Sequence, residues 1–167
     1  MAGRDPARVA APPGERALRG RIAPPRRPAV LLPRDELVAL ARTALEGPLV
    51  RVVAGAGWGK SVLLSQATAD LPVVVWCACD PRAARASLVP QLALAFARRV
   101  PGFRAEAGAG DSPEGRVAGL CDEIARAAPA ETLLVVDDAH LLAGTPGEAE
   151  LAELAASPPP QLRLAIA

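Results

Sequence analysis

A glycine-rich stretch that ends in lysine and serine is the part of this chain best suited to chemistry. Its sequence is Ala54-Gly55-Ala56-Gly57-Trp58-Gly59-Lys60-Ser61. The chain contains eighteen arginines and this single lysine, so a composition that favours arginine retains an ammonium group here. An ammonium group on a flexible stem suits a cluster of phosphate oxygens better than a planar guanidinium does. The stretch therefore predicts a phosphate-binding loop between a strand and a helix.

Each polar residue of this loop has an expected role toward a nucleoside triphosphate. Lys60 would bridge the β and γ phosphates, and the Ser61 hydroxyl would bind Mg²⁺. Backbone N–H groups at the start of the following helix would also face the phosphates. We expect Gly55, Gly57 and Gly59 to allow close approach and positive φ angles.

Two carboxylates in the second half of the chain complete the predicted site. Asp137 and Asp138 directly follow an apolar run over residues 132–136. Asp137 would hold Mg²⁺ through a water molecule, because this ion keeps several waters on a triphosphate. Asp138 would be the catalytic residue that orients or deprotonates an attacking water. The alternative is that both carboxylates only cap a strand end.

Other chemically distinctive residues allow two interpretations. His140, the only histidine, either senses the γ phosphate or is structural, and we favour the structural role. Trp58 either lies on the nucleotide side of the loop or fills the helix–sheet interface, and we favour the interface. Cys77 and Cys79 are expected to be buried thiols rather than metal ligands. An odd cysteine count without CxxC spacing fits a reducing, cytoplasmic environment.

Apolar strands that alternate with helices predict an α/β domain with a parallel sheet. The expected strands cover residues 49–53, 73–77, 132–136 and 162–167, and the expected helices include residues 61–69, 87–99 and 148–156. Asp35, Ser87 and Ser112 are the expected helix N-caps, with Pro113 in the first turn after Ser112. The first helix is expected to turn one apolar face inward, made of Leu37, Leu40, Ala41, Ala44 and Leu45.

Charge and composition divide the chain in two. Residues 1–28 carry seven arginines against Asp5 and Glu15 and are rich in proline, which predicts a disordered leader. The remainder, 29–167, carries twelve basic and sixteen acidic residues, so it has no overall basic surface for nucleic acid. No apolar run approaches the roughly 20 residues that cross a bilayer, so no membrane partner is expected.

Several short motifs occur together in an order that resembles a known family. They are Leu31-Leu32-Pro33-Arg34, Gly47-Pro48-Leu49, the loop from Ala54 to Ser61, Trp76, and Val135-Val136-Asp137-Asp138-Ala139-His140-Leu141-Leu142. Together they resemble the N-terminal ATPase module of large MalT-like, LuxR-family transcriptional regulators, which belong to the STAND class of P-loop ATPases. In that family alanine is usual at the first loop position and an aromatic residue is usual before the Gly-Lys pair.

The resemblance implies a three-layer P-loop NTPase fold of the ASCE/STAND type, with ATP and Mg²⁺ as cofactors. It places the strand at 162–167 between the loop strand and the Asp-Asp strand, and it places Arg34 near the adenine. The domain at 29–167 would be partial and its sheet incomplete after the fourth strand. The family's fifth strand, the arginine that senses the γ phosphate and the DNA-reading element would lie beyond Ala167. The loop strand would then be an exposed apolar edge.

Three functions follow as expectations. The first is a Mg-ATP-binding module of a signal-transducing transcriptional regulator, in which slow hydrolysis resets a nucleotide switch. The second is a catalytic AAA+-like P-loop ATPase, and the third is an inactive truncated fragment. Besides nucleotide, the expected partners are the missing C-terminal half of such a regulator or a second copy of the chain.

Overall fold

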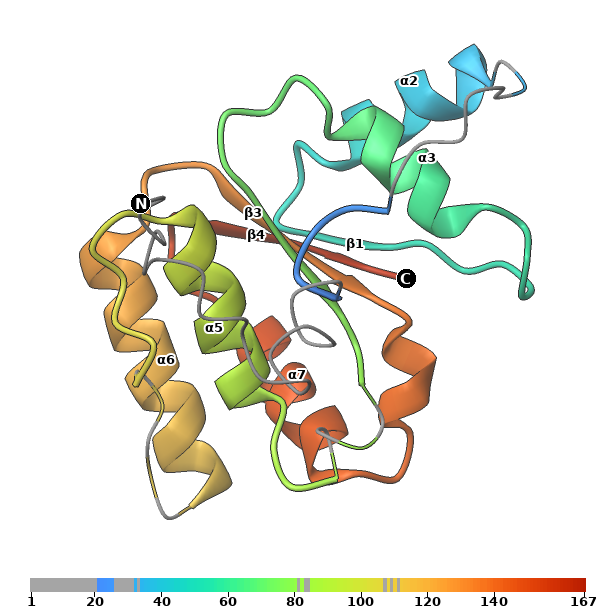
Figure 1. Cartoon of the computed structure of the whole chain (residues 1–167). Coiled ribbons are helices and arrows are strands. Elements are labelled where there is room, and N and C mark those ends of the chain that lie inside the picture. The colour runs from blue at the N-terminus through green and yellow to red at the C-terminus, as the bar shows by residue number, and fades with distance from the viewer. Residues whose placement is uncertain are drawn as a thin grey trace, which may run out of the picture.

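Four parallel strands form one sheet in the computed structural model of this chain (Figure 1). The structure describes residues 21–25, 32, 34–80, 82, 85–106, 108, 110 and 112–167. The strands are β1 (Leu49–Arg51), β2 (Val74–Ala78), β3 (Thr132–Asp137) and β4 (Leu162–Ile166). The helices are α2 (Asp35–Ala44), α3 (Lys60–Ala67), α5 (Val89–Arg99), α6 (Pro113–Ala127) and α7 (Pro146–Ala156), with a 3₁₀ turn η1 (Ala139–Leu142).

The order across the sheet is β1-β4-β3-β2, so the last strand in sequence lies beside the first. Register places Val50 beside Ala165 and Val135 beside Ala165 on the other side. The expected position of β4, between the loop strand and the Asp-Asp strand, is therefore confirmed. The strand β4 joins two segments that are more than eighty residues apart.

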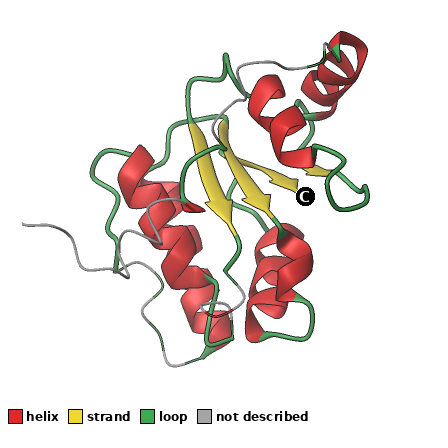
Figure 2. Ribbon diagram, turned by 45° about the vertical axis from the view of Figure 1, so that its right-hand side comes forward, coloured by secondary structure: helices red, strands yellow, loops and turns green. Residues whose placement is uncertain are grey.

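Two hydrophobic cores lie on the two faces of the sheet, which makes a three-layer α/β arrangement (Figure 2). Alternate residues of each strand face opposite sides. The helices α5, α6 and α7 cover the larger core, where Cys77, Leu134 and Leu164 are buried. The helices α2 and α3 cover the smaller core, where Leu64 and Val135 are buried.

Part of the predicted leader belongs to the folded domain. Ile22 is 8% exposed and packs in the larger core. The Arg21 Nη1 atom donates a hydrogen bond to the Cys79 carbonyl at 2.6 Å. Proline and arginine content predicts disorder throughout residues 1–28. Core packing of Ile22 and the Arg21 hydrogen bond instead attach this short segment to the domain. The leader residues before Arg21 lie outside the described residues.

The first helix differs from its prediction. Arg34 occupies the N-cap position, and Asp35 is the first helical residue without a side-chain cap bond. Leu37 and Leu40 are 47% and 66% exposed and Ala44 is exposed as well, so the expected inward face is wrong for these three residues. The helix lies at the rim of the smaller core, where only Leu45, just after its last turn, is buried.

The starts of α6 and α5 were both predicted to have a serine N-cap, and the structure confirms this fully only for α6. Ser112 accepts a hydrogen bond from the Gly115 N–H at 3.0 Å, as expected for an N-cap. The helix α5 begins at Val89 with Leu88 as its N-cap, one residue later than expected. The Ser87 Oγ atom still accepts a hydrogen bond from the Val89 N–H at 3.2 Å, so Ser87 has part of its expected capping role. The Glu150 carboxylate, from α7, also caps this end by accepting from the Leu88 N–H at 2.6 Å. No helix in the described part of the chain is long and apolar enough to cross a membrane.

Candidate phosphate-binding site

The glycine-rich loop joins β1 to α3 at the carboxyl edge of the sheet (Figure 1). Gly57 and Gly59 have φ angles of 78° and 79°, in the region that favours glycine. Gly59 is the N-cap of α3, which begins at Lys60. The first N–H groups of α3 therefore have no carbonyl acceptor earlier in the helix, and the positive end of the helix dipole faces the loop.

Gly55 serves the loop in a different way from that predicted. Its φ is not positive, but a Cβ atom there would lie 3.0 Å from two atoms of the Trp58 indole. The Trp58 ring thus packs directly on the Gly55 backbone. Trp58 is 71% exposed, so the favoured prediction that it fills the helix–sheet interface is wrong. The short loop directs the Trp58 indole toward solvent, away from the interface between the helix and the sheet.

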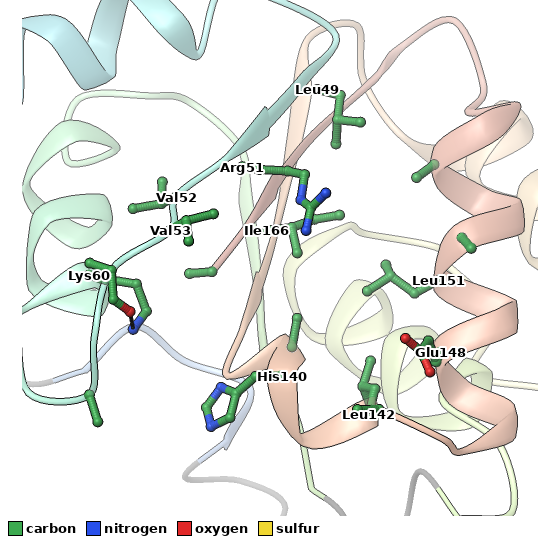
Figure 3. Close-up of a pocket in the computed structure, with 17 residues that line it drawn as sticks. Leu49, Arg51, Val52, Val53, Lys60, His140, Leu142, Glu148, Leu151 and Ile166 are labelled. Atoms are coloured by element: carbon green, nitrogen blue, oxygen red, sulfur yellow. Dashed lines mark hydrogen bonds between the residues drawn. The ribbon is translucent and has the colours of Figure 1, made fainter.

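Lys60 bends back over its own loop. Its Nζ atom donates to the Ala54 carbonyl at 2.9 Å (Figure 3). The same atom donates to the Gly55 carbonyl at 3.2 Å. Both acceptors are neutral, so the ammonium keeps its charge available to an anion. The Ser61 side chain follows in the first turn of α3 and is half-buried.

The carboxylates Asp137 and Asp138 stand at the carboxyl end of β3. Asp137 is 4% exposed, and its Oδ1 atom accepts a hydrogen bond from the Asp138 N–H at 3.0 Å. Asp138 is half-buried and has a φ of 57°, which aspartate tolerates better than most residues. The next N–H, of Ala139, donates to the Ala167 carbonyl at 2.7 Å, so the turn after β3 is tied to the end of β4.

The loop and the turn after β3 meet at one cavity of about 660 Å³. Lys60, Ala54 and Ala56 line it from the loop, and Ala139 and His140 line it from the turn (Figure 3). Ser61, Asp137 and Asp138 are not among the residues that line it. The parallel sheet places the two segments together because the carboxyl ends of β1 and β3 flank that of β4.

No three side chains of the His, Cys, Asp and Glu types gather as a metal site within the described ranges. Mg²⁺ is commonly held by one or two protein groups together with waters and substrate phosphates. Ser61 and a water-mediated Asp137 would be those protein groups.

Two of the three cysteines, Cys77 and Cys79, are buried thiols, as predicted. Cys77 and Cys79 have no exposed surface. Burial, then the Asp138 and Asp137 charges, raise the pKa of the Cys79 thiol to about 12. Burial also raises the pKa of Cys77. Neither thiol is therefore a thiolate at neutral pH, and neither is suited to metal binding or nucleophilic attack.

Comparison with known proteins gives no family for this chain. No protein-family model matches it, and no curated protein matches it.

Proposed function

We propose that this chain binds Mg-ATP as a P-loop NTPase of the ASCE/STAND type. The observation that carries the proposal is that the Lys60 ammonium and the start of α3, which has no side-chain cap, lie together at the carboxyl edge of a parallel sheet. In open α/β sheets this edge is where ligands bind. An anion there would meet an ammonium, backbone N–H groups and a helix dipole together.

In this proposal the triphosphate displaces the Lys60 ammonium from the two loop carbonyls and accepts its hydrogen bonds instead. Ser61 and, through water, Asp137 hold Mg²⁺, which neutralises charge on the phosphates. Asp138 orients the attacking water. The Asp138 side chain is half-buried and shorter than that of glutamate, so we expect slow hydrolysis. Slow hydrolysis suits a nucleotide switch better than a rapid motor.

The biological role within the proposal is the nucleotide switch of a signal-transducing transcriptional regulator of the MalT-like kind. Its support is the order of sequence motifs given above, together with a β4 position that this order implies. An AAA+-like catalytic ATPase shares the same loop and the same acidic strand. The two functions differ in turnover and not in the residues that bind phosphate.

Titration calorimetry with Mg-ATP tests the proposal on the full chain and on Lys60→Ala. Loss of charged hydrogen bonds is expected to cost about 1.5–3 kcal/mol, which is roughly 10- to 150-fold in affinity. Arg42→Ala is the matched control, because Arg42 is an exposed cation on α2 that pairs with Asp70. Equal affinity of Lys60→Ala and the parent chain would remove the proposal.

The intrinsic fluorescence of Trp58 gives a second readout. Trp76 is 2% exposed and Trp58 is 71% exposed, so a change caused by a ligand at the loop is expected from Trp58. Comparison of Mg-ATP with inorganic tripolyphosphate separates contacts of the base from contacts of the phosphates. Measured phosphate release near background would favour the switch, and brisk release would favour the catalytic ATPase.

A further inference from the structure

A groove runs beside β1, the strand at one edge of the sheet. It is the part of the 660 Å³ cavity that extends away from the loop. Leu49, Arg51 and Val53 line it from the edge strand and its continuation, and Leu151 lines it from α7 (Figure 3). Ile166, from β4, lies between them. The groove therefore lies between the edge strand β1 and helix α7, with β4 at its base.

Within the described part of the chain, the backbone of β1 pairs with another strand on one side only. Hydrogen bonds join the Val52 N–H to the Ile166 carbonyl at 2.8 Å and the Leu164 N–H to the Pro48 carbonyl at 2.9 Å. In a parallel ladder the alternate residues then direct their N–H and C=O groups away from the partner strand. Among the described residues, nothing pairs with the backbone groups that Leu49, Arg51 and Val53 direct to this side, and their pattern is one that another extended backbone satisfies.

The same three residues turn their side chains to the α7 side of the sheet, since alternate residues of a strand share a face. Leu49 is 40% exposed and Val53 is 84% exposed. Between them the Arg51 guanidinium makes no hydrogen bond or ion pair with any residue that the structure describes. Every second residue along this edge thus faces the groove, and the three in order are apolar, cationic and apolar.

The helix opposite leaves room for side chains from an added strand. Ala152 and Ala155 line the groove from α7 and are short. A strand paired with β1 would lie about 4.8 Å from it and would place alternate side chains in this space. A residue directly beside Arg51 would lie on the same face as Arg51, and its neighbours two positions away would contact Leu49 and Val53.

We propose that this groove binds an extended polypeptide segment with the pattern apolar–x–acidic–x–apolar, which adds to β1 as a further strand. Its acidic side chain pairs with Arg51, and its two apolar side chains cover Leu49 and Val53. The pattern is the same in both directions, so the parallel or antiparallel sense of the strand does not change it. This inference uses no residue of the proposed nucleotide site, although both border the same cavity.

Charge argues against a second copy of the chain as the occupant. An antiparallel pairing of β1 with β1 centred on Arg51 would set the two guanidinium groups against each other. Like charges directly opposite each other destabilise a strand pair, whereas opposite charges stabilise it. The residue that disfavours self-association therefore favours an acidic partner.

The test uses the full 167-residue chain and fluorescein-labelled peptides followed by fluorescence anisotropy. One peptide is Thr-Val-Thr-Glu-Thr-Val-Thr, and the other has lysine in place of glutamate. We expect the parent chain to prefer the glutamate peptide by about fivefold, the upper range of an exposed ion pair. Arg51→Glu is expected to prefer the lysine peptide instead. Arg51 is exposed, so this change should leave the fold intact.

Two controls test whether the peptide binds in the groove and whether Arg51 sets its charge preference. Arg42→Glu changes a cation on α2, away from the groove, and is expected to keep the glutamate preference. Amide resonances of Leu49, Arg51 and Val53 should shift with the glutamate peptide. Failure of both peptides to bind at millimolar concentration, or an unchanged preference in Arg51→Glu, would overturn the proposal. Dimers of the parent chain that exclude the peptide would also overturn it.

Discussion

The Arg34 guanidinium donates a hydrogen bond from Nη1 to the backbone carbonyl of Trp58 at 3.0 Å. The same group lies over Gly59, because a Cβ atom there would be 3.4 Å from Arg34 Nη1. The carbonyl of Trp58 is thereby held toward the start of α2. The arginine thus braces the glycine-rich loop at Trp58, whereas Lys60 binds the Ala54 and Gly55 carbonyls.

Arg34→Ala should therefore loosen the loop before any ligand binds. Loss of one hydrogen bond is expected to weaken Mg-ATP by about 0.5–1.5 kcal/mol, roughly two- to twelvefold. The fluorescence of Trp58 should change in the variant without nucleotide, because its carbonyl loses its partner. Arg34→Lys keeps a donor and should recover part of the affinity. An unaltered emission spectrum in Arg34→Ala would contradict a bracing role.

The same variant tests the adenine contact that family resemblance implies for Arg34. A residue that only braces the loop affects ATP and inorganic tripolyphosphate equally. A residue that contacts the base affects ATP alone. The ratio of the two affinity losses in Arg34→Ala, measured by calorimetry, separates these roles.

Asp138→Asn should bind Mg-ATP as well as the parent chain does and lose its hydrolysis. Asparagine tolerates the positive φ of 57° at this position, so the turn after β3 should keep its shape. Removal of a general base lowers turnover by about 10²–10⁴-fold. Single-turnover release of labelled phosphate measures the effect. A parent-like rate in Asp138→Asn would show that another group activates the water.

Local patterns predicted the four strands well, because each one is a short, mostly apolar run between turn residues, although β1 is largely exposed at the edge of the sheet. The position of β4 came from family resemblance, and the strand register agrees with it. The site residues that follow β1 and β3 were brought to one edge by this topology alone. Glycine positions in the loop were less predictable, since Gly55 is needed for contact with an indole and not for its φ angle.

Features that depend on distant packing were missed. Trp58 is apolar and large, so it was assigned to an interface, but the loop directs it to solvent. Leu37 and Leu40 lie on an apolar stripe that no described element covers. The sequence motifs do not single out Glu150. Its partners are 34 to 63 residues away in sequence, a separation that no local pattern reports.

The Glu123 carboxylate should make stability fall in acid. Hydrogen bonds from Arg126, opposed in part by burial and helped by the Arg104 N–H at 2.8 Å, lower the pKa of Glu123 from 4.5 to about 2. A pKa lowered by folding means that the charged form stabilises the fold. This contribution is complete above about pH 4.5 and disappears as the pH falls toward 2.

Urea unfolding at several pH values measures this contribution. The parent chain should lose more stability between pH 4.5 and pH 2 than Glu123→Gln does, because the variant has no carboxylate to protonate at this position. Glu148→Gln is a useful control, since Glu148 is exposed. Parallel pH profiles for the parent chain and Glu123→Gln would contradict the assignment.

The Glu150 carboxylate joins three helices and should be essential to stability. Its side chain is fully buried and accepts from the Leu88 N–H at 2.6 Å, from the Ser87 hydroxyl at 2.9 Å and from Arg116 Nη2 at 2.8 Å. Glu150→Ala would leave the Leu88 N–H and a largely buried guanidinium without a partner. Loss of one partner from a buried ion pair costs about 3–5 kcal/mol, a large part of a typical domain's stability.

Denaturant unfolding of paired variants shows whether the charge or the packing matters. Glu153→Ala, an exposed position on the same helix α7, should cost little. Glu150→Leu combined with Arg116→Met removes both charges and fills their volume, so it should be more stable than Glu150→Leu alone. If the double variant were no more stable than the single one, the unpaired guanidinium would not be the source of the loss. The unsatisfied N–H groups at the start of α5 would then account for it.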